Sequence, residues 1–182
     1  MLGARARAAF ASEDKRKNYL EQMAGKAQAM VAALDEIVWA MNPRHDSLDS
    51  LISYFSLYAD HFLGLANIAW RLEEAGESPA FGLDSRRRHQ LFLAFKEALA
   101  NVVRHAGATE VRLSIRLEHG EVRLSVTDNG RGLPEGGRTD AMDGIANMRA
   151  RLEKAGGRFE ILSHENQAGV TVRFFVPAEQ EL

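Results

Sequence analysis

The stretch EVRLSIRLEHGEVRLSVTD, residues 110–128, constrains the fold of this chain more than any other. In its first half Val111, Leu113 and Ile115 alternate with polar residues, and the second half repeats this pattern. Such alternation is typical of a strand with one buried face, and the intervening His119–Gly120 pair predicts a tight turn. We therefore expect a β-hairpin whose apolar face is covered by helices and whose polar face is open.

Other segments extend this hairpin into a sheet. RFEIL (residues 158–162) and GVTVRFFVP (residues 169–177) alternate in the same way, and Asn67–Glu73 looks like a short strand. Apolar residues spaced by three and four predict helices at about residues 47–65, 84–105 and 145–157. The sum is an α+β fold, a two-layer α/β sandwich with a mixed, mostly antiparallel sheet.

The first forty residues predict one long helix, which Pro43 ends with Asn42 held extended before it. This helix carries a heptad seam, made of Leu20, Met23, Ala27, Met30, Leu34, Ile37 and Met41. Val31 and Val38 widen the seam, which favours a helical bundle over a bare two-stranded coil. We expect the helix to self-associate; the alternative is that it packs back onto the rest of the chain.

Bulk composition excludes several classes of function. With 46% hydrophobic and 26% charged residues the chain is an ordinary globular protein, and its net charge of −2 gives no argument for direct nucleic-acid binding. The chain has no cysteine, which excludes disulfides and thiolate chemistry and is compatible with a reducing cytoplasm. No apolar run approaches the ~20 residues of a membrane-spanning helix.

The segment FKEALANVVRHA, residues 95–106, combines an apolar and a polar helix face. Phe95 and Leu99 lie on the first face, whereas Glu97, Asn101 and Arg104 gather on the opposite one. The simplest interpretation is a solvated surface. The alternative is that this polar stripe forms one wall of a binding site.

Asp128 is conspicuous because strand alternation places it on the apolar face of the hairpin, beneath the helices. A carboxylate in that position is costly unless a donor satisfies it. One interpretation is that Asp128 and Asn129 cap the turn that follows. The other is that Asp128 accepts a hydrogen bond from the amino group of a ligand, such as adenine. The glycine-rich loop NGRGLPEGG directly after it would let the ligand come close to the backbone.

A second glycine lies in DAMDGIANMRARLEKAGG, residues 140–157. We expect Gly144 to open this helix, with Asp143 as its cap, so that free backbone N–H groups could hold phosphate.

FKEALANVVRHA, DNGRGL and GIANMRARLEKAGG, in this order before a closing GVTVRFFVP, resemble the ATP-binding domain of sensor histidine kinases. That domain has the GHKL, or Bergerat, fold shared with gyrase, a heat-shock chaperone and mismatch-repair ATPases. The resemblance is strongest to the subfamily paired with helix-turn-helix response regulators, in which LDEIVWAMNPRHDSLDSL looks like the join after the second dimerisation helix. It implies a partial dimerisation helix over residues 1–44 and an ATP-binding catalytic domain over residues 45–182.

The resemblance implies ATP and Mg²⁺ as ligands and assigns roles to residues of these motifs. Glu97 would act as general base or orient the attacking group, and Asn101 would offer its side-chain oxygen to Mg²⁺. Asp128 would accept a hydrogen bond from the adenine amine. The other expected nucleotide-binding residues are Arg104 and His105 beside the phosphates, Gly130 and Gly132 in the close loop, Gly144 in the lid, and Thr171.

Two positions depart from the family pattern. Met142-Asp143-Gly144 keeps only the second glycine of a Gly-x-Gly box, and Gly169 is followed by Val170 before Thr171, where relatives commonly have Gly-Thr. These changes keep open a degenerate, non-catalytic dimeric scaffold. A serine phosphotransferase of the same superfamily, acting on an anti-sigma antagonist, is a further alternative, which the long heptad helix disfavours.

The acceptor histidine of a kinase is not evident in the chain. RHDSLDSL imitates an acceptor box, yet His45 lies two residues after Pro43, at a joint. None of the remaining histidines outside the nucleotide motif is followed by aspartate: His61, His89, His119 and His164. We therefore expect a chain that starts after the acceptor helix, binds ATP and does not phosphorylate itself.

The expected function follows from these assignments. The γ-phosphoryl group of ATP would pass to a histidine on a dimerisation helix and then to an aspartate of a response regulator with a helix-turn-helix output domain. The chain would act as a homodimer through its N-terminal helix, in the cytoplasm, whether or not its parent protein is anchored in a membrane.

Overall fold

The computed structural model describes residues 2–42, 47–73, 82–133, 140–163 and 169–178. The chain divides into two compact units, Met1–Trp39 and Ala40–Leu182. The expected functional boundary after residue 44 falls close to this division, and the roles of the two parts stay a prediction.

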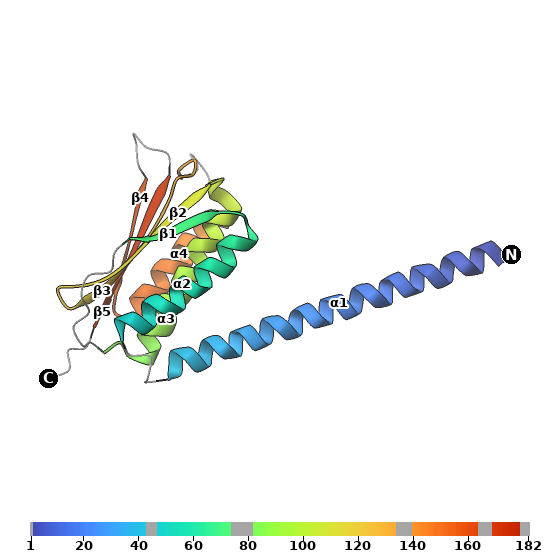
Figure 1. The fold of residues 1–182 in the computed structure, drawn as a ribbon, viewed down its shortest axis with the longest axis horizontal. Coiled ribbons are helices and arrows are strands. Elements are labelled where there is room, and N and C mark those ends of the chain that lie inside the picture. Colours follow the sequence, from blue (N-terminus) through green and yellow to red (C-terminus); the bar gives the residue numbers. More distant parts are fainter. Residues whose placement is uncertain (1, 43–46, 74–81, 134–139, 164–168, 179–182) are drawn as a thin grey trace. The chain divides into compact units, whose positions relative to one another are not determined.

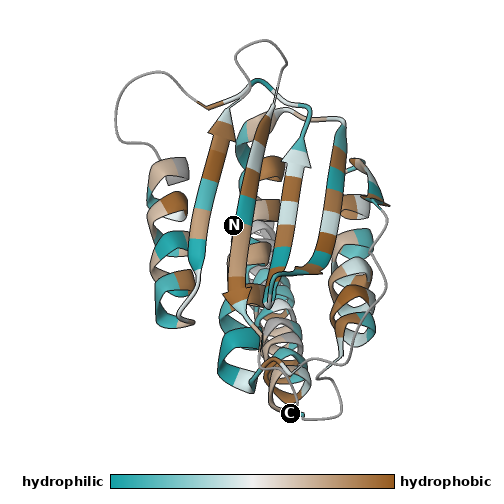
Figure 2. Ribbon diagram, turned by 90° about the vertical axis from the view of Figure 1, so that its left-hand side faces the viewer, coloured by the Kyte–Doolittle hydropathy of each residue, from teal (hydrophilic) through white to brown (hydrophobic). Residues whose placement is uncertain are grey.

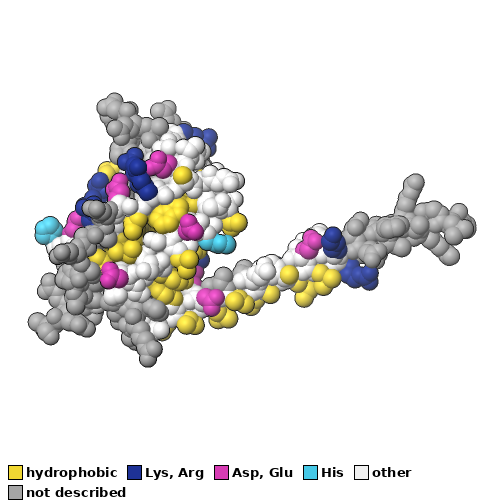
Figure 3. Space-filling model, in the orientation of Figure 1, with side chains coloured by type: hydrophobic (Ala, Val, Ile, Leu, Met, Phe, Trp, Pro, Cys, Tyr) yellow, Lys and Arg dark blue, Asp and Glu magenta, His cyan; other side chains and the backbone are white. Residues whose placement is uncertain are grey.

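The first unit consists of the helix α1 (Leu2–Met41) as far as Trp39, and this helix confirms the long helix predicted from the heptad seam. Apart from Trp39 and Ala40, which are buried, its large described apolar side chains are exposed and gather along one side of the helix in Figure 3. They include Leu20, Met23, Met30, Val31, Leu34, Ile37, Val38 and Met41. Pro43 and His45, on which two of the expectations depend, lie outside the described residues. In the described part of the chain, no helix has the length and apolar character needed to cross a membrane.

The second unit is a sheet with helices on one face (Figure 1). Its helical elements are α2 (Leu48–Leu65), α3 (Ser85–Asn101), the π-helical turn η2 (Val102–Ala106) and α4 (Asp140–Lys154). Its strands are β1 (Ala69–Glu73), β2 (Glu110–Glu118), β3 (Glu121–Asp128), β4 (Arg158–Ser163) and β5 (Val170–Pro177). The strand order is β1-β2-β3-β5-β4, in which β1 and β2 pair in parallel and the other pairs are antiparallel. The predicted two-layer α/β sandwich is confirmed.

The hairpin of β2 and β3 follows the predicted alternation. Along β3 every second residue is buried, from Val122 to Asp128, and Figure 2 shows the corresponding bands of hydropathy along the strands. The turn between the strands has positive φ at both His119 (53°) and Gly120 (78°), the conformation that a two-residue hairpin favours. The buried face of the sheet packs against the helices, where Phe55, Phe92 and other aromatic rings form a tight cluster.

Two of the predicted helix starts are fixed by side-chain caps. The Ser47 hydroxyl accepts from the N–H of Ser50 at the start of α2, and the Asp84 carboxylate accepts from the N–H of Arg87 at the start of α3. Both caps satisfy backbone donors that the first helical turn leaves without intrahelical partners.

The start of α4 differs from the prediction. This helix begins at Asp140, so Gly144 lies in its second turn and Asp143 is not its cap. The N–H of a fifth helical residue bonds to the carbonyl four positions earlier, and it is therefore not one of the free donors at a helix start. The reason for a glycine at position 144 is therefore not a free N–H group. It is the close approach of Glu97 and Asn101 to this position, described below.

Arg88 is a buried charge near the start of α3, with 1% of its surface exposed. Its guanidinium donates to the carbonyl oxygens of Ala40, Asn42 and Leu83. These contacts fix the entry of the chain into the second unit, because they hold residues 40–42 against α3.

Candidate functional site

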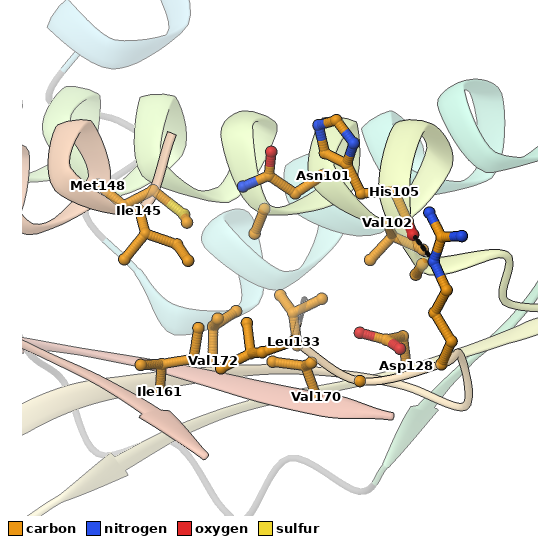
Figure 4. A pocket seen from close by; sticks show the side chains of 15 residues that line it. Asn101, Val102, His105, Asp128, Leu133, Ile145, Met148, Ile161, Val170 and Val172 are labelled. Atoms are coloured by element: carbon orange, nitrogen blue, oxygen red, sulfur yellow. Dashed lines mark hydrogen bonds between the residues drawn. The ribbon is translucent and has the colours of Figure 1, made fainter. Parts of the chain in front are cut away.

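A cavity of about 280 Å³ lies between the helical layer and the sheet (Figure 4). The helical layer contributes residues from α3, η2 and α4, the sheet contributes residues from β3, β4 and β5, and the loop after β3 closes one end. Its apolar lining is Ala98, Val102, Ala106, Val126, Leu133, Ile145, Met148, Ile161, Val170 and Val172. Its polar lining is Asn101, His105, Asp128, Arg131 and Gly132. An apolar slot with a few polar groups suits a flat, mostly apolar ligand that carries a polar edge.

Asp128 points from the end of β3 toward this cavity (Figure 4) and is 8% exposed. One of its carboxylate oxygens, Oδ1, accepts from the N–H of Gly130 at 2.8 Å. The two interpretations of this residue are therefore compatible, because Asp128 shapes the turn and also lines the cavity. Asn129 fixes the same turn on the other side: its Oδ1 accepts from the N–H groups of Thr109 and Glu110 at 2.9 and 3.0 Å.

The glycines after Asp128 allow the loop to approach the end of η2. A Cβ atom built on Gly130 would stand 2.3 Å from the carbonyl oxygen of Ala106, so no side chain fits there. Gly132 has a φ of +85°, a conformation that L-residues with side chains rarely adopt. The loop and the helix end therefore form one wall without side chains between them.

Beside Asn101 of the cavity wall, α3 and α4 meet at Gly144. A Cβ atom built on this buried glycine would stand 2.5 Å from Oε1 of Glu97 and 3.1 Å from both terminal atoms of the Asn101 side chain. The bare backbone of α4 thus leaves room for a carboxylate and an amide side by side. Asn101 lines the cavity, and Glu97 lies beside it on the same helix.

Comparison with known proteins identifies the family. The sequence profile of the histidine kinase-, DNA gyrase B- and HSP90-like ATPases matches residues 87–180, slightly more than half of the 182 residues. The chain belongs to this ATPase family. The matched part contains α3, the loop after β3 and α4, and so contains the cavity with its Asp128, Asn101 and Gly144.

Sensor kinases are the relatives that this ATPase resembles. It is 28% identical over 167 residues to the sensor histidine kinase LiaS of Bacillus subtilis, which covers 90% of this chain and 43% of LiaS. It is 33% identical over 89 residues to the nitrate/nitrite sensor protein NarX of Escherichia coli K12, which covers 49% of this chain and 15% of NarX. The chain therefore spans less than half the length of these two relatives. The predicted resemblance to sensor histidine kinases is confirmed.

Solved structures confirm the fold of the ATPase. The catalytic domain of histidine kinase ThkA superposes with a TM-score of 0.57 at 20% identity, covering 74% of this chain and 96% of that one. The histidine kinase domain of the Erythrobacter litoralis EL346 blue-light activated histidine kinase gives a TM-score of 0.56 at 20% identity, covering 70% and 60%. The chain thus has the fold of these catalytic domains.

Four of the eight expected nucleotide-binding residues line the cavity. Asn101, His105, Asp128 and Gly132 line the cavity of the ATPase, whereas Arg104 is exposed and does not. Helical spacing explains this difference: Ala98, Asn101, Val102 and His105 share one face, and Arg104 lies off it.

Thr171 also lies outside the cavity lining. Val170 and Val172 are the residues of β5 that line the cavity, and Thr171 faces the opposite side of the sheet. There its hydroxyl lies 2.9 Å from the hydroxyl of Thr127 on β3. The extra Val170 in the closing motif accounts for this placement, because it shifts the threonine by one strand position.

Arg131 is a lining residue that the sequence analysis did not single out. Its backbone N–H donates to the carbonyl of Ala106 at 2.9 Å, and its Nε donates to the carbonyl of His105 at 2.8 Å (the dashed line in Figure 4). The signal in the sequence was its position between the two glycines of DNGRGL. Nothing in this local pattern shows that the arginine reaches the end of a helix, because that contact depends on how the loop packs.

The residues present can accommodate Mg²⁺ only together with a ligand that supplies oxygens. Among the described residues, no group of three or more histidine, aspartate or glutamate side chains is arranged to hold a metal ion. Mg²⁺ in nucleotide sites usually retains waters and phosphate oxygens and takes few ligands from the protein. The side-chain oxygen of Asn101, with Glu97 close by, fits that limited role.

Proposed function

We propose that this chain binds Mg-ATP in the cavity and transfers the γ-phosphoryl group to a histidine on a dimerisation helix. The observation that carries this proposal is the polarity of the cavity. Asp128 lies at one end beside a close-packed glycine loop, and Asn101 and Glu97 lie toward the other end, against the bare backbone of Gly144. A base with an amino edge suits the first end, and phosphates suit the second.

The base would lie between the apolar side chains of the sheet and helices. Ile161, Val172 and Met148 offer flat apolar contact, and Asp128 offers a carboxylate to an exocyclic amine. A carboxylate accepts but does not donate hydrogen bonds when ionised, so it favours adenine, which donates at this edge. Buried polar groups of this kind select strongly between ligands, because the wrong partner leaves them unpaired.

At the phosphate end, the residues would position groups more than they would react. Glu97 would orient the attacking imidazole or take its proton, and Asn101 would hold the metal ion through its side-chain oxygen. Mg²⁺, when bound with the nucleotide, neutralises part of the charge that develops on the phosphates. His105 lines the cavity between the two ends, and exposed Arg104 would reach the phosphates only from outside it.

The phosphoryl acceptor is proposed to be a histidine other than the six of this chain. His105 belongs to the nucleotide wall, His45 imitates an acceptor box but lies two residues after Pro43, and the other four histidines are not followed by aspartate. By analogy with sensor kinases, the phosphoryl group would then pass to a response regulator with a helix-turn-helix output domain. Dimerisation through the exposed apolar side of α1 and action in the cytoplasm, where ATP is available, belong to the same proposal.

One alternative function has a specific observation in its favour. A non-catalytic dimeric scaffold would also display the exposed apolar seam of α1, and Met142 stands where relatives commonly have a glycine. The scaffold and the kinase differ in one measurable property, which is Mg²⁺-dependent nucleotide affinity.

Calorimetric titration with ATP, with and without Mg²⁺, separates these functions. The kinase proposal expects Mg²⁺ to raise the ATP affinity of the native chain and expects this gain to disappear in Asn101→Ala. Asn147→Ala, on the exposed side of α4, is the matched control and should retain the gain. A native chain with no Mg²⁺-dependent gain would support the scaffold instead.

Mass spectrometry tests where the phosphoryl group goes. After incubation with Mg-ATP, without acid treatment, the chain alone should carry no phosphohistidine. A stoichiometric phosphohistidine would show that one of its own histidines is the acceptor.

A further inference from the structure

Arg131 has a distinctive position in the cavity wall. Among the described lining residues, it carries the one permanent positive charge, yet its Nε donates to the carbonyl of His105 in η2. The residue is exposed to solvent, and the two hydrogen bonds that it donates both go to backbone carbonyls. The side chain makes one of these bonds, through Nε, and the backbone N–H makes the other.

The carbonyls that Arg131 contacts are those of a helix end. The last four carbonyls of a helix have no intrahelical partner, and together they form the negative end of the helix dipole. Arg131 supplies donors to two of them, on His105 through Nε and on Ala106 through its backbone N–H. Its positive charge is therefore placed where the helix dipole favours a cation.

The loop that carries Arg131 needs such an anchor. Gly130 and Gly132 give it close approach and a positive φ, but glycine also gives the loop more alternative conformations than any other residue. Asn129 ties the loop to the start of β2, and Arg131 ties it to η2. The same segment contains the N–H of Gly130, which donates to the carboxylate of Asp128. The shape of the loop and the orientation of Asp128 are thus linked.

We infer that Arg131 is a positioning residue for the nucleotide, which acts by holding the Asn129–Leu133 loop against η2 rather than by contacting phosphate. This inference rests on the proposed function, since it concerns the same site. Without the anchor, a smaller fraction of the molecules has the base site formed. The apparent affinity is proportional to the fraction of molecules with a formed site. It therefore falls by the same factor for every ligand that contains the adenine base.

The test compares ATP, ADP and adenosine in competition against a fluorescent ATP analogue. In Arg131→Ala we expect the dissociation constants of all three to rise together, by about tenfold, the equivalent of one charge-assisted hydrogen bond that orders the site. Arg131→Lys should restore part of the affinity, because an ammonium can reach one carbonyl but lacks the guanidinium fork. Arg116→Ala, an exposed arginine on β2 away from the cavity, is the matched control and should change none of the three.

Two outcomes would overturn the inference. If ATP and ADP weaken while adenosine does not, Arg131 contacts the phosphates directly. If no ligand weakens, the anchor has no consequence for binding. A native chain that binds none of the three ligands would instead reject the proposed function, so the two failures are distinguishable.

Hydrogen exchange provides a readout that does not depend on nucleotide affinity. In the nucleotide-free chain, the amide of Gly130 should exchange faster in Arg131→Ala than in the native protein, and saturating ATP should restore its protection. Equal exchange in the two nucleotide-free proteins would overturn the inference.

Discussion

The Glu97 carboxylate lies against the bare Cα of Gly144: a Cβ atom built on this glycine would stand 2.5 Å from Oε1. Because the contact involves the far end of a flexible side chain, Gly144→Ala should displace Glu97 without unfolding the domain. We expect stability to be unchanged or to rise by up to about 1 kcal/mol, since alanine favours a helix over glycine. The rate of phosphoryl transfer to an added acceptor helix should fall by at least about tenfold, because general acid–base groups contribute 10²–10⁴-fold when correctly placed.

Gly64→Ala in α2 is the control for that change. No atom lies within 4 Å of a Cβ atom built there, so the variant should gain the same helix stability without losing transfer. Thermal unfolding and the rate of phosphoryl transfer are measured on both variants and compared with the native chain. If Gly144→Ala transfers phosphate at the native rate, the position of Glu97 is not critical.

Thr171→Val tests the placement of Thr171 outside the cavity. Its hydroxyl lies 2.9 Å from that of Thr127 on the face of the sheet opposite the cavity, and Thr171 is 5% exposed, whereas Val170 and Val172 line the cavity. We expect a loss of about 1 kcal/mol in the free energy of unfolding, from the lost hydrogen bond, and an ATP affinity within twofold of native. Urea unfolding and calorimetry check the two parts. A large loss of affinity with unchanged stability would mean that the hydroxyl serves the nucleotide.

Arg88→Met should destabilise the second unit strongly. The substitution leaves the carbonyls of Ala40, Asn42 and Leu83 without the donors that the buried guanidinium supplies, and each buried acceptor left unsatisfied costs about 1–3 kcal/mol. We expect a total loss of at least about 2 kcal/mol in urea unfolding. Arg86→Met, at an exposed neighbouring position, should change stability little. Equal stability of the two variants would contradict this account of Arg88.

Leu34→Glu tests association through α1. Leu34 is 61% exposed on the apolar side of this helix, and a seam of this kind is expected to be covered by another copy. Sedimentation should show a dimer for the native chain and a marked shift toward monomer for the variant, because each buried leucine contributes about 1.5–3 kcal/mol. Gln28→Glu, off the seam, should leave the dimer intact. A native chain that is monomeric at all concentrations would remove this basis for dimerisation.

Strand alternation made much of the sheet predictable. It placed Asp128 on the helical face with Val122, Leu124 and Val126, and burial along β3 confirms that placement. The same argument applied to β5 puts Thr171 on the face opposite Val170 and Val172. The family pattern suggested a nucleotide role for Thr171, and strand parity was the better guide to its position.

Other features could not be predicted because local sequence does not encode them. The parallel pairing of β1 with β2 depends on the path of α3 between them, not on the residues of β1. Nothing in VVRHA marks the π-helical turn that ends α3. At α4, Asp140 and Asp143 both suit a helix start, and only the packing of Gly144 against Glu97 shows that the glycine lies inside the helix.

The most direct test of the account is a calorimetric titration of Mg-ATP into the native chain and into Asp128→Ala. Asp128 is buried, lines the cavity and accepts from Gly130, so the account predicts binding by the native chain and a loss of at least about a hundredfold in the variant. Asp143→Ala, on the exposed side of α4, should bind as the native chain does. Equal binding by the native chain and Asp128→Ala would contradict the assignment of Asp128 as the group that recognises adenine.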